Sequence, residues 1–164
     1  MYLIWECFEM IKLNYLVRVA MIAAIYVVLS ILFAPISYGP VQVRIAEALV
    51  VLPFIDPSAI IGLFLGCVLA NVYGGLGMVD IIGGSLCTLI AAYLTYKVKN
   101  PKFAPLPPVL INAFGVSIYL HLLFDLPYWI TVLYIGIGEV IACYILGYPL
   151  LILLIKNKKR LGLE

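Results

Sequence analysis

Long apolar runs, separated by short polar or proline- and glycine-rich turns, make up most of this chain. No Asp, Glu, Lys or Arg occurs in residues 19–43, 57–79 or 81–96, and further runs of this kind follow toward the C-terminus. A helix that crosses a bilayer needs about 20 mostly apolar residues. The pattern therefore predicts an all-α integral membrane protein.

Six transmembrane helices fit this pattern within residues 15–155. The second is expected to be short, because it ends at Pro53 and its dozen residues would reach only about 18 Å across a hydrocarbon core of about 30 Å. Pro149 is expected to bend the sixth helix. The expected positions are about 15–34, 41–52, 57–79, 78–96, 109–124 and 128–155. A turn at Gly74–Gly77 separates the third helix from the fourth.

The two ends of the chain differ from this domain. Residues 1–14 mix apolar side chains with Glu6, Glu9 and Lys12, a pattern that suits an amphipathic segment at the membrane surface. Residues 156–164 contain three lysines and Arg160. The chain thus divides into an interfacial segment, a six-helix domain and a basic tail.

Basic residues predict the orientation of the chain. They precede the first helix, occupy the proline-rich loop at 97–108 and close the chain at 156–164, while the turns at 37–40, 74–77 and 125–128 carry no Lys or Arg. With six spans the three basic groups fall on one side, and cytoplasmic loops of membrane proteins are enriched in Lys and Arg. Both termini are therefore expected to be cytoplasmic.

Composition agrees and excludes other classes. Hydrophobic residues make up 66% of the 164 residues and charged ones 11%, whereas a soluble domain has about 25% charged residues. A net charge of +2 without a basic patch does not indicate nucleic-acid binding. The four cysteines are scattered and lack metal-ligand spacing, so no metal site is expected.

Small residues mark two expected helix contacts. Gly62, Gly66, Ala70 and Gly74 are spaced by four, a ridge that lets another helix approach closely. An A-x-x-x-A step at Ala20 and Ala24 on the first helix is a candidate surface for a partner protein.

Polar side chains inside the apolar runs mark a candidate site, because such groups are expensive in membrane spans and are mostly functional. On the predicted topology most of them fall in the outer half of the membrane, so the site would take something from outside. The candidate residues are Arg44 and Glu47 in the second helix, Asn71, Tyr73, Asp80, Asn112 and Glu139 in the later ones, and Tyr38 in the loop after the first.

Structural roles compete with ligand contact for the charged residues. Arg44 and Glu47, three residues apart, could neutralise each other. Asp80 could serve only to favour the N-terminus of its helix through the dipole. Glu139 lies near the midplane with no cation close to it in sequence, so a structural explanation fits it least.

The neutral polar residues have similar alternatives. Asn71 and Asn112 could be interhelical hydrogen-bonding groups. His121 and Asp125, four residues apart, favour an interfacial pair over a ligand site.

Missing motifs limit the possible functions. The sequence contains no G-x-x-x-x-G-K-[ST], G-x-S-x-G or H-E-x-x-H motif, so we expect neither an enzyme nor a cofactor in this chain. A small membrane protein of this kind can be a channel, a secondary carrier or the binding subunit of a powered complex. Carriers usually contain two inverted repeats, and no two halves of this sequence match.

Five segments resemble a known family. They are Arg18–Ala24, VQVRIAEALVVLPF at 41–54, GLFLGCVLAN at 62–71, GGLGMVDIIGGSLCTLIAAYLTY at 74–96 and GEVIACYILGYPLL at 138–151. From about Arg18 to Leu154 the chain is similar to the queuosine-precursor transporter family. Its members are substrate-binding components (S components) of energy-coupling factor (ECF) transporters.

The resemblance implies a six-helix subunit of a prokaryotic plasma membrane, with an outward-facing site capped by the loop after the first helix. It implies three partner subunits, a membrane coupling subunit and two ATPases that use the ATP. Ala20 and Ala24 would then be the docking surface for the coupling subunit. The implied substrate is a 7-deazaguanine, either prequeuosine or its nitrile relative.

The residue chemistry fits this substrate class. A guanine-like edge offers two adjacent N–H donors to one carboxylate, and the cationic aminomethyl arm of prequeuosine would favour a second. Glu47 and Glu139 are the two deep carboxylates, with Asp80 in reserve, and which binds which end of the ligand stays open. The other candidates are donors to the ring carbonyl (Asn71, Asn112, Arg44) and stacking rings (Tyr38, Tyr73).

Two other functions stay open. One is an S component for another planar nutrient such as thiamine, riboflavin or tryptophan, which would have the same architecture. The other is a structural or channel-like membrane protein whose buried charges only pair with one another. That protein would bind no soluble ligand.

Overall fold

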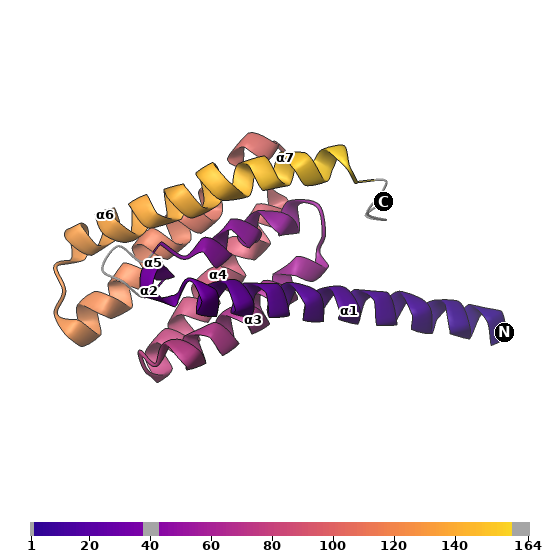
Figure 1. The fold of residues 1–164 in the computed structure, drawn as a ribbon, viewed down its shortest axis with the longest axis horizontal. Coiled ribbons are helices and arrows are strands. Elements are labelled where there is room, and N and C mark those ends of the chain that lie inside the picture. The colour runs from indigo at the N-terminus through magenta and orange to yellow at the C-terminus, as the bar shows by residue number, and fades with distance from the viewer. Residues whose placement is uncertain (1, 38–42, 159–164) are drawn as a thin grey trace.

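The computed structural model of this chain describes residues 2–37 and 43–158, and within 2–12 the backbone alone. These residues form a helical bundle without strands (Figure 1). The α-helices are α1 (Tyr2–Leu32), α2 (Ala34–Ser37), α3 (Ser58–Gly74), α4 (Met78–Lys97), α5 (Leu106–Phe124), α6 (Tyr128–Glu139) and α7 (Tyr148–Lys156). Two 3₁₀-helices, η1 (Ile45–Phe54) and η2 (Pro101–Phe103), and a π-helix, η3 (Val140–Gly147), complete the list.

Four helical segments are long and apolar enough to cross a membrane, namely Leu13–Leu32, Met78–Lys97, Pro101–Phe124 and Tyr128–Lys156. Two apolar helices, η1 and α3, are shorter. The all-helical prediction is therefore confirmed for the described residues, and so is the short second helix. Six spans require η1 and α3 to cross as well, and this stays a prediction.

Both ends of the first helix differ from expectation. α1 runs without interruption from Tyr2 to Leu32, so the backbone of residues 2–14 continues the first spanning segment, and Figure 1 shows this part extending beyond the rest of the bundle. Its place at the membrane surface stays a prediction. Residues 38–42, which follow α2, lie outside the described part of the chain.

The fifth helix begins earlier than expected. Leu106 rather than Val109 starts α5, and Pro107 and Pro108 lie in its first turn. The first turn of a helix tolerates proline because its N–H groups have no intrahelical partner. A proline pair that we assigned to the loop therefore belongs to the helix.

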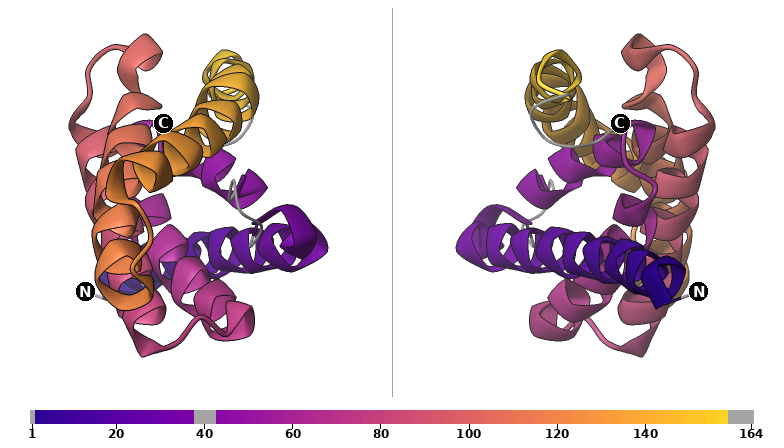
Figure 2. Two further views of the ribbon diagram at one scale, coloured as in Figure 1. Left: turned by 90° about the vertical axis from the view of Figure 1, so that its left-hand side faces the viewer. Right: turned by 90° about the vertical axis from the view of Figure 1, so that its right-hand side faces the viewer.

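The second helix, η1, is a 3₁₀-helix that begins at Ile45 and includes Pro53, rather than an α-helix at 41–52. A 3₁₀-helix rises about 2.0 Å per residue, so ten residues reach about 20 Å. Seven of the ten are buried, as expected of a helix inside the core. Figure 2 shows η1 between α1 and the rod formed by α6, η3 and α7.

The irregularity expected near Pro149 takes the form of π-helical turns before it. η3 joins α6 directly to α7, and Pro149 lies in the first turn of α7. In an α-helix the proline ring would collide with the carbonyl of Ile145 four residues earlier. The wider turns of a π-helix relieve this collision.

The three basic groups lie at one end of the bundle. Arg18 of α1 forms an ion pair of 3.5 Å with Asp56 in the turn after η1. Ala104, which follows the lysines at 97, 99 and 102, packs in one cluster with Leu151 and Ile155 of the C-terminal helix. Figure 1 shows the start of α1 and the end of α7 at this end. Which side of the membrane this end faces stays a prediction.

The glycine ridge of α3 packs closely against α1. A Cβ atom at Gly66 would lie 2.8 Å from the Cβ of Tyr26 and 3.0 Å from the backbone oxygen of Ala23. Gly62 meets Val19 and Ile22 in the same way. The predicted close approach is thus confirmed for these two glycines. It places Tyr26 of α1 directly against the backbone of α3.

We expect Gly66→Ala to destabilise the protein, because the added methyl group meets backbone as well as side chain. Overpacking costs about 1–3 kcal/mol, and the gain in helix propensity of up to about 1 kcal/mol offsets only part of it. Thermal unfolding of the purified chain in detergent measures the difference. The matched control is Gly136→Ala, whose new methyl group would lie 3.6 Å from its nearest neighbour, Ala113. Equal melting temperatures for both variants would contradict the close contact.

Candidate functional site

A buried polar cluster at the centre of the bundle brings together six of the eight predicted site residues. The helices η1, α3, α4, α5 and α6 each contribute to it. Its predicted members are Arg44, Glu47, Asn71, Asp80, Asn112 and Glu139, and five of these are at most 4% exposed while the Arg44 side chain is 12% exposed.

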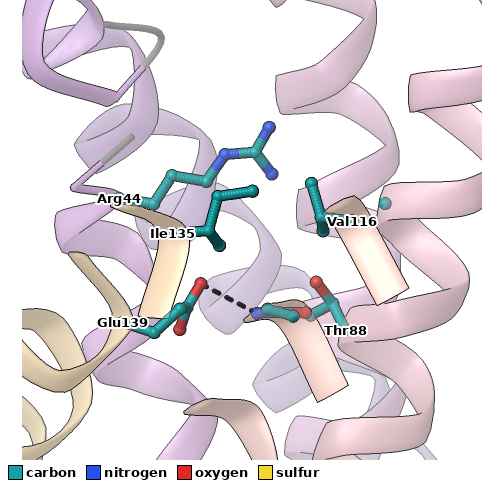
Figure 3. A pocket seen from close by; sticks show the side chains of 7 residues that line it. Arg44, Thr88, Val116, Ile135 and Glu139 are labelled. Atoms are coloured by element: carbon teal, nitrogen blue, oxygen red, sulfur yellow. Dashed lines mark hydrogen bonds between the residues drawn. The ribbon is translucent and has the colours of Figure 1, made fainter. Parts of the chain in front are cut away.

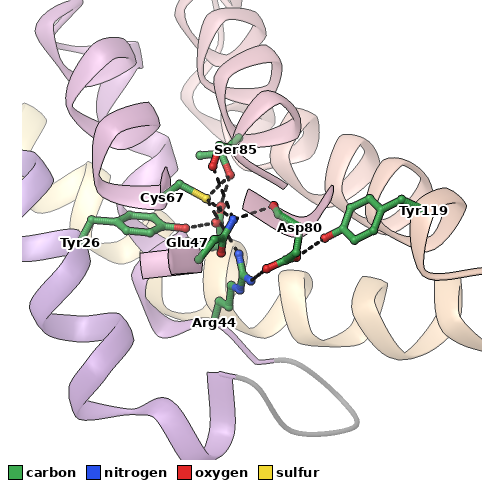
Figure 4. Close-up of polar contacts among 9 residues, drawn as sticks. Tyr26, Arg44, Glu47, Cys67, Asp80, Ser85 and Tyr119 are labelled. Carbon is green, nitrogen blue, oxygen red and sulfur yellow. Dashed lines mark hydrogen bonds and ion pairs between the residues drawn. The ribbon is translucent and has the colours of Figure 1, made fainter. Parts of the chain in front are cut away.

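The side chain of Glu47 accepts hydrogen bonds from three side chains of the cluster. The hydroxyl of Tyr26 donates to its Oε1 atom (Figure 4), and the hydroxyl of Thr88 lies 3.4 Å from the same oxygen. Asn112 donates to Oε2 at 3.2 Å. An isolated buried carboxylate would be strongly unfavourable, so donors from α1, α4 and α5 hold this one in place.

Asn112 joins the two deep carboxylates. Its Nδ2 atom also donates to Oε1 of Glu139 at 2.9 Å, so the two carboxylate oxygens are no more than about 6 Å apart. Cys143 of η3 lies 3.4 Å both from Oε2 of Glu139 and from the backbone oxygen of Glu47. The Oδ1 atom of Asn112 has no hydrogen-bond partner among the described residues. It is an acceptor available to a ligand.

Arg44 forms an ion pair with Asp80. Its Nη2 atom lies 3.9 Å from Oδ2 of Asp80, and Tyr119 donates to the other carboxylate oxygen of Asp80 at 2.5 Å (Figure 4). Arg44 is the extended residue before η1, and Glu47 lies in the first turn of η1; that the two neutralise each other stays a prediction. Asp80 is therefore engaged with side chains of other elements as well as lying in the first turn of α4.

Asn71 links α3 to α4. Its Nδ2 atom donates to the backbone oxygen of Asp80 at 3.1 Å and lies 3.5 Å from the hydroxyl of Ser85. Asn71 therefore forms an interhelical hydrogen bond, which was one of the two roles that the sequence allowed for it, the other being ligand contact.

A small cavity opens beside the cluster (Figure 3). Its volume is about 10 Å³, close to what a single water needs. A bicyclic ligand therefore does not fit unless side chains move. The cavity is lined by Arg44, Gly84, Thr88, Asn112, Val116, Ile135 and Glu139.

The remaining predicted residues lie elsewhere. Tyr73 is 58% exposed near the end of α3 and does not reach the cluster. Tyr38 lies outside the described residues. The predicted interaction between His121 and Asp125 is wrong. α5 ends at Phe124, and Asp125 takes a left-handed conformation with φ of 51°, so it does not continue the helix. His121 instead bonds through Nδ1 to the backbone oxygen of Leu126 at 2.6 Å.

Sequence reasoning missed the neutral donors of the cluster. Tyr26 shares one face of α1 with the buried Val19, Ala23 and Ser30, and this helical spacing was readable in the sequence. Thr88 of α4 follows a similar spacing. The cluster residues not predicted are Tyr26, Cys67, Ser85, Thr88, Tyr119 and Cys143.

No group of three or more His, Cys, Asp or Glu side chains in the described part of the chain is arranged to hold a metal ion. The charged and amide groups of the cluster are three carboxylates, two amides and a guanidinium. These groups bind and orient polar molecules through hydrogen bonds and charge.

The fold defines a helical membrane protein with a buried polar cluster. A family model described as QueT transporter matches residues 16–156. The chain belongs to the QueT transporter family.

One curated relative and no solved structure match the chain. The relative, the queuosine precursor transporter QueT of Lactococcus lactis subsp. cremoris (strain MG1363), is 38% identical over 77 residues. The match covers 46% of this chain and 45% of the relative, so it spans about half the length of each protein.

We expect Tyr119→Phe to weaken the ion pair between Asp80 and Arg44, because Asp80 loses the hydrogen bond that Tyr119 donates. Hydrogen bonds to charged groups contribute about 1.5–3 kcal/mol, so the free energy of unfolding should fall by about that amount in a thermal or denaturant measurement. Tyr134→Phe is the matched control, since Tyr134 of α6 is 48% exposed. Tyr119→Phe with the stability of the control would contradict this role.

Proposed function

We propose that this chain is the substrate-binding membrane subunit of an ATP-driven ECF uptake transporter, and that it captures a 7-deazaguanine queuosine precursor from outside the cell. The observation that carries the proposal is the Glu47–Asn112–Glu139 bridge at the centre of a member of a transporter family. The printed name of the Lactococcus relative, a queuosine precursor transporter, supports the substrate class.

The bridge fits a ligand that is both a hydrogen-bond donor and a cation. Two carboxylates with oxygens no more than about 6 Å apart repel each other in a weakly polarisable interior, and a cationic group bound near both would offset that repulsion. The aminomethyl arm of prequeuosine is such a group. The adjacent N–H donors on the guanine-like edge match the two oxygens of one carboxylate.

Arg44 and Asn112 complete the set of partners. The free Oδ1 atom of Asn112 can accept a ring N–H, and the Arg44 guanidinium, which lines the cavity, can donate to the ring carbonyl. Since the cavity has room for about one water, binding requires it to widen. The Arg44 side chain, at 12% exposed, is more exposed than the carboxylates of the cluster.

Glu47→Gln and Glu139→Gln test the substrate site. Each keeps the shape of the side chain but removes its charge, so each should weaken prequeuosine binding at least thirtyfold, which corresponds to about 2 kcal/mol. Isothermal titration calorimetry on the purified chain measures the affinity, and a melting curve verifies folding. Asp125→Asn, an exposed carboxylate outside the cluster, is the control. Wild-type affinity in both glutamine variants would exclude this site.

The ATP-driven part of the proposal rests on two observations. The 164-residue sequence lacks a phosphate-binding loop motif, so ATP hydrolysis is assigned to partner subunits. Ala20 and Ala24 are exposed on α1, while Val19 and Ala23 next to them are buried against the bundle. An exposed small-residue step of this kind allows a helix of another subunit to approach closely.

Large residues at Ala20 and Ala24 test the docking surface. The double variant Ala20→Phe/Ala24→Phe should bind prequeuosine as the wild type does but fail to co-purify with a coupling subunit and ATPases expressed alongside it. Ile118→Phe, on the exposed face of α5, is the control for added bulk at a lipid-facing position. Co-purification of the double variant at wild-type yield would contradict the proposed docking surface. It would not affect the proposal for the substrate site.

A further inference from the structure

A second hollow lies far from the polar cluster, at the end of the bundle that carries the basic residues. It is an apolar groove of about 320 Å³ between the last turns of α4 and the first turns of α5. It shares no residue with the cavity beside Arg44. The groove is lined by Leu94, Lys97, Val98, Leu106, Pro107, Leu110 and Ile111.

Lys97 is the single charged residue among those that line the groove, and its ammonium group lies near two tyrosine rings. Its Nζ atom lies 5.3 Å from the ring centroid of Tyr93 and 5.1 Å from that of Tyr96, within the range of cation–π attraction. Lys99 and Lys102 follow in the same short loop and are exposed. The groove is therefore lined by apolar side chains, and lysines lie at one end of it.

The loop that carries these lysines is held against α4. The hydroxyl of Thr95, in the last turn of α4, donates to the backbone oxygen of Ala104 at 3.2 Å. Asn100 accepts a bond from the backbone N–H of Lys102 at 3.1 Å and so caps η2. The groove and its lysines thus form one ordered unit rather than a gap between independent segments.

The order of side chains along the groove matches the depth profile of a bilayer. Leu94 and Leu110, both at least 40% exposed, lie one turn further into their helices than Lys97 and Leu106. Tyrosine and lysine near the end of a spanning helix are typical of the interface between membrane and water. The apolar floor therefore lies at the depth of acyl chains and the lysines at the depth of headgroups.

We propose that this groove binds an anionic phospholipid, with one acyl chain along Leu94, Leu106 and Leu110 and the phosphate at Lys97. Pro107 and Pro108 carry no N–H in the first turn of α5, so the lysines supply the donors for the phosphate. Basic pockets between spanning helices are known to take such headgroups. The site requires only that the chain lies in a membrane and is independent of the substrate that we propose.

Native mass spectrometry of the full chain in detergent tests the proposal, with dioleoyl phosphatidylglycerol and dioleoyl phosphatidylcholine supplied at equal concentration. The wild type should retain the phosphatidylglycerol about fivefold more than its zwitterionic counterpart, the effect expected of one lysine near an anionic headgroup. Lys97→Gln should abolish this preference. Lys156→Gln removes a charge at the same end but outside the groove, and should keep it.

The acyl-chain contact needs its own variant. Leu110→Trp fills the groove and should reduce retention of both lipids several-fold, whereas Ile118→Trp, two turns further along α5 and equally exposed, should not. Equal retention of the two lipids by the wild type, equal loss in Lys97→Gln and Lys156→Gln, or full retention by Leu110→Trp would each overturn the proposal. Retention of neither lipid would do so as well and would point to a protein partner for this groove.

Discussion

The burial of one carboxylate organises this bundle. Glu47 is 1% exposed, and each group that stabilises it comes from a different part of the chain: Tyr26 from α1, Thr88 from α4 and Asn112 from α5. Those helices must pack around η1 at the depth of Glu47, or a buried charge remains without donors at a large cost. The glycines of α3 let α1 approach closely enough for the Tyr26 hydroxyl to reach it.

Two sets of contacts connect the charged groups of the cluster. Arg44, Asp80 and Tyr119 form a chain of side chains, whereas Glu47 and Glu139 share one amide donor. The second set brings two carboxylates close to each other, and the cationic, hydrogen-bonding substrate that we propose would offset their repulsion.

The sequence was most informative where charge interrupts an apolar run. Arg44, Glu47 and Glu139 were identifiable because each is expensive in a membrane span, and the structure brings all three together. Tyr26 and Thr88 escaped notice because a single hydroxyl costs little in such a run. The 3₁₀ form of η1, the π turns of η3 and the early start of α5 were not predictable, because tertiary packing and proline sterics, rather than hydrophobic period, decide them.

Three residues per turn give η1 a property that an α-helix in its place would lack. Its side chains align in three straight rows that do not drift around the axis. Ala48, Val51 and Phe54 form one row, toward Gly147 and the C-terminal helix, while Ala46 and Leu49 belong to another, within the cluster that includes α1 and α3 residues. Glu47 begins the third, toward the polar cluster. Val50 of the third row also packs in the apolar cluster that holds Ala46 and Leu49. The straight rows therefore let one short helix contact the C-terminal helix, α1, α3 and the polar cluster at once.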